Sequence, residues 1–298
     1  LNISLILAIY FSRDKTQIEI VYYLSYGVVI GGLLQLFSHV AAIRKLGLLK
    51  PFCMGFKHLR VKSQKIKDET KKFKKQFFPA VWGNSTPQVS AFLDTLLASF
   101  LATGSISYLY YANRIFQLPL ALFAIAVSIA LFPSIARYIK NQDTVKAKEF
   151  MKRAFWFLTF LLTASTIGGY ILSYEIIWLL FERGSFTSKD TLESSSVLQM
   201  YMIGLLPLGL QKLFLLWLYA NEQQMRAAKI ATFSLVFYII SAFALIVPMG
   251  ASGLALSGTI SGFAGFFLTV KAFGIKEFFD MLISKKALYL LLSSVILI

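Results

Sequence analysis

The chain has 298 residues, of which 57% are hydrophobic and 15% are charged, and its mean hydropathy is +0.68. Soluble domains carry about 25% charged residues, so this composition excludes an ordinary soluble globule and an intrinsically disordered chain. Basic residues outnumber acidic ones 30 to 14, and in so apolar a chain this excess indicates orientation in a membrane rather than binding to nucleic acid.

Apolar runs that could form membrane-spanning helices follow one another along the chain. A bilayer core of about 30 Å needs about 20 apolar residues in a helix, and a backbone exposed to lipid must satisfy its own hydrogen bonds. The predicted spans are 1–11, 20–42, 78–103, 106–136, 154–180, 196–220, 230–248, 251–270 and 287–298. We therefore expect an all-α, polytopic transmembrane helical bundle with about seven full spans. The first and last runs are interpreted as truncated spans of a longer protein.

Lysine and arginine are distributed unevenly among the loops between these spans. Loops rich in these residues alternate along the chain with loops poor in them, and the two sets hold 24 and four basic residues. The rich set is 43–77, 137–153, 221–229 and 271–286. The poor set is 12–19, 103–106, 181–195 and 249–251. Because cytoplasmic loops of membrane proteins are enriched in Lys and Arg, we expect the rich set to be cytoplasmic. The nine basic residues of 57–75 favour an orientation signal on a surface helix, with a dedicated lipid-headgroup site as the alternative.

Two opposite charges are expected at similar depth on neighbouring spans. Asp94 lies ten residues before Gly104, and Arg114 lies nine residues after Ser105, at the tip of a predicted hairpin on the outside. At 1.5 Å per residue both charges lie about 14–15 Å below this tip, near the middle of the membrane. They could form an ion pair that locks the hairpin, or they could line a polar cavity.

Polar residues next to Arg114 favour the cavity. Asn113 and Gln117 are four residues apart and share a helix face, and Pro119 removes a backbone donor one turn from Ile115. A polar, kinked patch within a membrane is typical of alternating-access transporters, and the planar guanidinium of an arginine suits a phosphate.

A third charge, Lys212, follows Pro207 and Gly209 and lies far from either end of span 196–220, which favours a position facing the cavity. The residues predicted to bind substrate are Arg114, Asn113, Gln117, Asp94 and Lys212. The residues predicted to form a hinge or gate are Gly104, Ser105 and Pro119.

Signatures of catalysis are missing from the sequence. It contains no glycine-rich phosphate loop followed by Lys-Ser/Thr, no HExxH and no GxSxG. The single cysteine, Cys53, excludes an intramolecular disulfide framework, and His39 and His58 are the only histidines. We expect no enzymatic activity, no cofactor and no metal site.

Four segments, taken together, resemble the MurJ (MviN-type) lipid II flippases, which belong to the multidrug/oligosaccharidyl-lipid/polysaccharide exporter group. These segments are 81–101, 104–138 (GSISYLYYANRIFQLPLALFAIAVSIALFPSIARY), 181–191 (FERGSFTSKDT) and 201–231 (YMIGLLPLGLQKLFLLWLYANEQQMRAAKIA). The resemblance implies a protein of fourteen helices in two lobes around a central cavity. This chain would then run roughly from the fifth to the thirteenth helix.

The same resemblance implies a domain organisation. Residues 1–42 would be the last two helices of the N-terminal lobe, and 43–77 a basic cytoplasmic linker. Residues 78–272 would be the C-terminal six-helix lobe, and 273–298 the start of additional helices.

The function implied is transport of lipid II, the undecaprenyl-linked peptidoglycan precursor, from the cytoplasmic to the outer leaflet of the bacterial inner membrane. Its partners would be lipid II, membrane lipids and cell-wall synthesis proteins, and not nucleic acid. Arg114 matches the family's cavity arginine in the YYAxR motif. Asn113 and Gln117 replace acids common in the family, which makes the site more positive. The resemblance implies coupling to sodium in some relatives, but 230–248 lacks Asp, Asn, Glu and Gln, so sodium coupling is not predicted here.

Two alternatives stay open. One is a different exporter of the same superfamily that moves a polysaccharide-linked lipid or a drug. The other is a membrane scaffold that transports nothing, in which the charges within the membrane only join helices.

Overall fold

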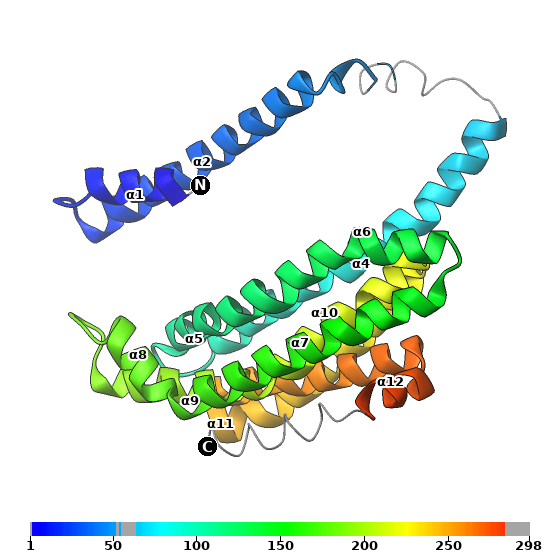
Figure 1. The fold of residues 1–298 in the computed structure, drawn as a ribbon. Coiled ribbons are helices and arrows are strands. Elements are labelled where there is room, and N and C mark those ends of the chain that lie inside the picture. The colour runs from blue at the N-terminus through cyan, green and yellow to red at the C-terminus, as the bar shows by residue number, and fades with distance from the viewer. Residues whose placement is uncertain (1, 52–53, 55–63, 284–298) are drawn as a thin grey trace. The chain divides into compact units, whose positions relative to one another are not determined.

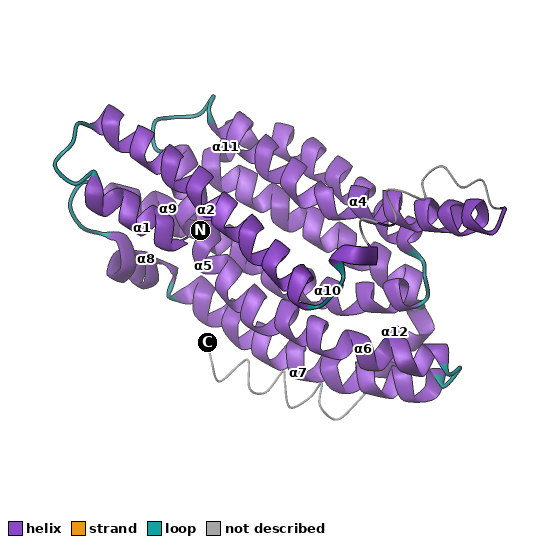
Figure 2. Cartoon of the chain, turned by 90° about the horizontal axis from the view of Figure 1, so that it is seen from above, coloured by secondary structure: helices purple, strands orange, loops and turns teal. Residues whose placement is uncertain are grey.

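The computed structural model describes residues 2–51, 54 and 64–283, and all regular secondary structure in this part of the chain is helical (Figures 1 and 2). The all-α prediction is therefore confirmed. The chain divides into two compact units, Leu1–Thr70 and Lys71–Ile298. The predicted span 287–298, Cys53 and His58 lie outside the described residues.

The first unit contains α1 (Asn2–Phe11) and α2 (Gln17–Lys45), which match the predicted spans 1–11 and 20–42. Thr16 begins α2 with a capping box, in which its backbone N–H donates to Glu19 Oε2 at 3.0 Å. The two helices pack closely, since a Cβ atom on Gly27 would lie 2.9 Å from Ala8 Cβ.

The second unit contains the core and the remaining helices. The first of these, α4, begins seven residues before the boundary at Lys71, so most of it lies in the second unit. Its elements are α4 (Gln64–Ala98), α5 (Ser105–Pro119), the π-helix η1 (Leu120–Ile125), α6 (Ala126–Lys140), α7 (Thr144–Ile171), α8 (Ser173–Phe181), α9 (Ser188–Ile203), α10 (Leu205–Ala220), α11 (Gln224–Phe273) and α12 (Ile275–Leu282). The core is centred on buried side chains such as Phe155 and Leu158 of α7 and Phe214 of α10. The short helix α12 is fixed to α7, because Trp156 Nε1 donates to the Met281 carbonyl at 3.2 Å.

Four described helical stretches are long and apolar enough to cross a membrane, and five if the bent pair α9–α10 counts as one span. The four are Ile18–Lys45, Ser105–Lys140, Thr144–Ile171 and Gln224–Phe273. The predicted span 78–103 is not among them, since α4 ends at Ala98 and its second half carries many polar residues. Many large apolar side chains are exposed on the described helices, as expected for surfaces that face lipid.

The 50-residue helix α11 is a hairpin of two helices. Gly250 has the non-helical angles φ 58° and ψ −130°, and Ser261 Oγ donates to the Ser234 carbonyl at 2.7 Å. In a straight helix these two residues would lie about 40 Å apart, so the chain folds back at Gly250, from yellow to orange in Figure 1. The separate spans predicted at 230–248 and 251–270 are confirmed.

The predicted span 196–220 is not one straight helix. A capping box of Thr187 and Asp190 begins α9, as the sequence suggests, but the chain bends by 41° between α9 and α10. At the bend the Gly204 N–H donates to the Tyr201 carbonyl, and the Met200 carbonyl accepts from Thr259 Oγ1 at 2.6 Å. A Cβ atom on Gly204 would lie 2.7 Å from Thr259 Oγ1, so this hydrogen bond requires glycine.

The helix that carries Arg114 changes its hydrogen-bonding pattern directly after Pro119. There α5 continues without a loop into the π-helix η1 and then into α6. Proline lacks the N–H of a regular turn, and π-helical turns commonly occur at functional sites. The irregularity agrees with the kink that the sequence predicts at this proline.

Candidate functional site

Three faces of α5 have different environments, as its 3.6-residue repeat requires. The buried face consists of Ser105, Leu109, Ala112 and Phe116. A half-buried face carries Tyr108 and Tyr111, and the exposed face carries Tyr110, Arg114 and Gln117. The polar residues that the sequence singles out therefore lie away from the core.

Arg114 interacts with its own helix. Its Nη2 donates to the Tyr110 hydroxyl at 3.0 Å, and its Cζ lies 4.7 Å from the centroid of the Tyr110 ring, a cation–π distance. One turn on, Gln117 Nε2 donates to Asn113 Oδ1 at 2.9 Å. A guanidinium has five N–H donors, so the bond to Tyr110 leaves donors that can bind an anion.

Asp94 is directed towards α11 and does not pair with Arg114. The buried Tyr238 donates its hydroxyl to Asp94 Oδ1 at 2.5 Å. No ion pair joins Asp94 to Arg114 within the described ranges, so the locked-hairpin alternative is wrong. A substrate contact by Asp94 stays a prediction, because the structure does not bring it together with the exposed face of α5.

Lys212 is half-buried on α10. It lies on a different helix from Arg114, and a role of both cations in one cavity stays a prediction. Gly104 is the N-cap of α5 with a left-handed φ of 101°, and Ser105 Oγ donates to the Ala102 carbonyl at 2.8 Å. The tight turn lies where the hinge is predicted, and the hinge role stays a prediction.

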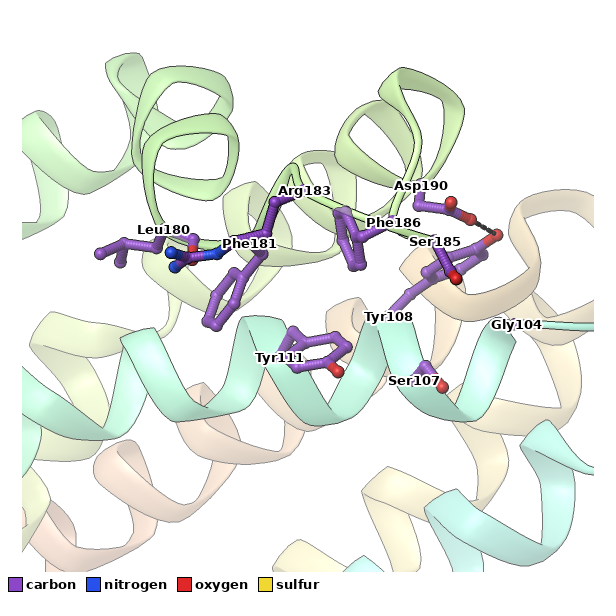
Figure 3. Close-up of a pocket in the computed structure, with 10 residues that line it drawn as sticks. All are labelled: Gly104, Ser107, Tyr108, Tyr111, Leu180, Phe181, Arg183, Ser185, Phe186 and Asp190. Atoms are coloured by element: carbon purple, nitrogen blue, oxygen red, sulfur yellow. Dashed lines mark hydrogen bonds between the residues drawn. The ribbon is translucent and has the colours of Figure 1, made fainter. Parts of the chain in front are cut away.

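Sequence reasoning missed a pocket of about 560 Å³ at the first turns of α5. It lies between α5, the end of α8 and the loop before α9 (Figure 3). The lining includes Tyr108, Tyr111, Phe181, Arg183, Phe186 and Asp190. The three-residue spacing of the two tyrosines is a signal of a shared face, but the sequence alone does not pair that face with segment 181–191.

Loss of the hydroxyl of Tyr238 is expected to destabilise the protein. In a Tyr238→Phe variant the half-buried acceptor Asp94 Oδ1 loses the hydrogen bond from the Tyr238 hydroxyl. Because a fully buried polar group without a partner costs about 1–3 kcal/mol, we expect a loss near the lower end of that range. Thermal unfolding in detergent should give a lower midpoint than for the natural protein. The matched change Tyr170→Phe, at a tyrosine 40% exposed, should leave the midpoint unchanged, and equal midpoints for both variants would contradict the interpretation.

The described residues contain no group of three or more His, Cys, Asp or Glu side chains that could hold a metal ion. Two separate carboxylates, Asp190 and Asp94, each accept a hydrogen bond from a tyrosine hydroxyl. The geometry thus offers an exposed arginine with polar neighbours, which is suited to binding an anion.

Comparison with known proteins extends over the whole chain. The profile of the family described as "Lipid II flippase MurJ" matches residues 1–298. A "Probable lipid II flippase MurJ" of Helicobacter pylori is 49% identical over 295 residues, which cover 96% of this chain and 64% of that protein. The protein of the same description from Haemophilus influenzae is 33% identical over 80% of this chain and 46% of its own length.

Two solved structures are similar in fold. "Lipid II flippase MurJ, inward closed conformation" matches with a TM-score of 0.73 and 28% identity, covering 98% of this chain and 58% of that one. The Vibrio cholerae MATE transporter VcmN in the bent form matches with a TM-score of 0.55 and 15% identity, over 89% of this chain and 56% of that one. The second likeness concerns the fold alone. The chain thus spans about three fifths of the length of its Helicobacter pylori relative and of the first solved structure.

Proposed function

Because the chain belongs to the lipid II flippase MurJ family, we propose that the full-length protein moves lipid II from the cytoplasmic to the outer leaflet of the bacterial inner membrane. The observation that carries the proposal is the exposed Arg114 on α5, which forms the first part of the apolar stretch Ser105–Lys140, long enough to cross a membrane. A charge in such a place is costly unless it lines a wet cavity or meets a partner of opposite charge.

In this proposal Arg114 binds the anionic pyrophosphate of the lipid. Its planar fork can donate two parallel hydrogen bonds to phosphate oxygens, and Tyr110 supports the guanidinium from one turn away. Asn113 and Gln117 offer amide groups to the sugar and peptide of the same headgroup. The polyprenyl tail remains in lipid.

The other predicted residues have supporting roles. Lys212 adds positive charge to the cavity, and Asp94 contributes a carboxylate held by Tyr238. Gly104, Ser105 and Pro119 allow α5 to change its direction during alternating access, because they lie at its two irregular ends. Loops 43–77, 137–153, 221–229 and 271–286 face the cytoplasm. The protein partners would be cell-wall synthesis enzymes that use the delivered precursor.

Depletion of the host flippase provides the test of the function. Bacteria depleted of their own lipid II flippase lyse, and expression of the full-length protein is expected to restore growth and the access of lipid II to reagents outside the cell. Failure to rescue despite normal membrane expression would contradict the proposal. Drug efflux without rescue would instead indicate another exporter of the superfamily, and neither activity would indicate a scaffold.

A further inference from the structure

The first two turns of α5 are held from one side by residues of the α8–α9 connection. We call this contact the α5 clamp and define it as Tyr108 and Tyr111 of α5, with Phe181, Phe186 and Asp190 (Figure 3). Neither the predicted substrate residues nor the proposed function uses it.

One half of the clamp is a hydrogen bond to a carboxylate that is already fixed. Asp190 Oδ2 accepts from the Thr187 N–H and from Thr187 Oγ1, both at 2.7 Å. Asp190 Oδ1 then accepts from the Tyr108 hydroxyl at 2.8 Å. A Cβ atom on Gly104 would lie 2.6 Å from that hydroxyl, so the absence of a side chain at Gly104 leaves room for the tyrosine.

The other half is aromatic. The ring of Tyr111 lies 4.7 Å from the ring of Phe181 and 5.4 Å from that of Phe186, centroid to centroid. The second contact is edge-to-face, with an interplanar angle of 85°, a favoured arrangement for aromatic pairs. Thr191 Oγ1 donates to Glu182 Oε2 at 2.6 Å, which ties the two ends of the loop together and keeps both phenylalanines in place.

The position of Arg114 follows from this contact. Residues three apart in an α-helix are separated by about 60° around the axis and about 4.5 Å along it. Tyr108, Tyr111 and Arg114 form such a series, so a clamp on the two tyrosines fixes the rotation of α5 and hence the direction of Arg114. The buried face of α5 also packs against the core. At the first turn, however, Gly104 supplies no side-chain cap, so the clamp provides the polar restraint there.

We propose that the α5 clamp, through the Tyr108–Asp190 hydrogen bond, is a positioning device that sets the rotation of α5 and aims Arg114 at the anionic group of the substrate. Tyr108 then acts through Arg114 and does not touch the substrate. The inference rests on the proposed function only for the identity of that substrate.

A double-mutant cycle tests the coupling. Binding of lipid II to the full-length protein in nanodiscs is measured for the natural protein, Tyr108→Phe, Arg114→Ala and the double variant. Coupling between interacting residues corresponds to about two- to 150-fold in affinity, and the indirect action of Tyr108 places it in the lower part of this range. Tyr108→Phe is therefore expected to weaken binding about three- to tenfold when Arg114 is present and by less than about twofold when it is absent. An equal loss in both backgrounds, or no loss in either, would overturn the proposal. The control Tyr174→Phe, at an exposed tyrosine of α8, should bind as the natural protein does.

A second measurement separates the clamp from the proposed function. In a background where Cys53 and every other native cysteine of the full-length protein are replaced by serine, single cysteines replace the half-buried Asn113 or the exposed Gln117. The rates at which these two cysteines react with a charged thiol reagent are then compared. If the clamp sets the rotation, Tyr108→Phe raises the ratio of the rate at 113 to that at 117 severalfold, even if no variant binds lipid II. An unchanged ratio would overturn the clamp whether or not lipid II binds.

Discussion

Arg114→Ala is expected to abolish the rescue of flippase-depleted cells and to lower lipid II transport at least about tenfold, because hydrogen bonds to charged groups contribute about 1.5–3 kcal/mol each. Arg114 is exposed, and among the described residues its guanidinium donates a hydrogen bond only to Tyr110 of its own helix. Its removal should therefore leave folding largely intact. Rescue assays combined with immunoblots of the membrane fraction distinguish lost transport from lost protein.

Two further variants sharpen this experiment. Arg114→Lys keeps the charge but loses the planar fork, so transport between that of Arg114→Ala and the natural protein is expected. Arg137→Ala is the matched control, since Arg137 is an exposed arginine in the last turn of α6 on the same continuous stretch. Full rescue by Arg114→Ala at normal expression would contradict the proposal that Arg114 binds the pyrophosphate of lipid II.

Gly253→Ala is expected to cause the largest loss of stability from a single added methyl group. A Cβ atom there would lie 2.2 Å from the Leu245 carbonyl oxygen, a backbone atom fixed by the turn at Gly250. Overpacking of this kind costs about 1–3 kcal/mol, and we expect the upper end of that range because no flexible side chain can yield. Thermal unfolding and the yield of folded protein in detergent measure the effect.

Gly258→Ala provides the control on the same half of α11. The atom nearest to a Cβ at Gly258 is Tyr201 Cε1, at 3.9 Å, which is an ordinary van der Waals distance. Alanine is also a better helix former than glycine by about 0.8–1 kcal/mol, so this variant should be as stable as the natural protein or slightly more stable. A Gly253→Ala protein that melts at the same temperature as Gly258→Ala would contradict the tight turn.

Much of the fold follows from local sequence. Apolar runs predict the helices, and the division into spans 230–248 and 251–270 predicts the two halves of α11, which Gly250 and the Ser261–Ser234 hydrogen bond confirm. The capping box at Thr187 and Asp190 predicts the start of α9, because the residues that form it lie within three positions of each other.

Other features depend on contacts between distant parts of the chain and escape such reasoning. The bend at Gly204 is stabilised by Thr259, and Asp94 meets Tyr238, 144 residues away, rather than Arg114. Depth along a helix, which the sequence provides, does not fix the direction in which a side chain points. The polar cluster of Asn113, Arg114 and Gln117 could be predicted because the three residues share one helix. The α5 clamp could not, because it joins two segments about 80 residues apart.

The π-helix after Pro119 determines how the buried face before it is aligned with the buried face after it. The last buried residue before the π turn is Phe116, and the buried residues within or after it are Ala124, Ser128 and Ile135. In an uninterrupted α-helix these three would point about 80–120° away from Phe116, and the wider turn of η1 compensates for this angular offset. In effect one additional residue has been accommodated in the spiral. The buried residues of α5 and of α6 can therefore face the same side, although their spacing in the sequence does not fit one uninterrupted α-helix.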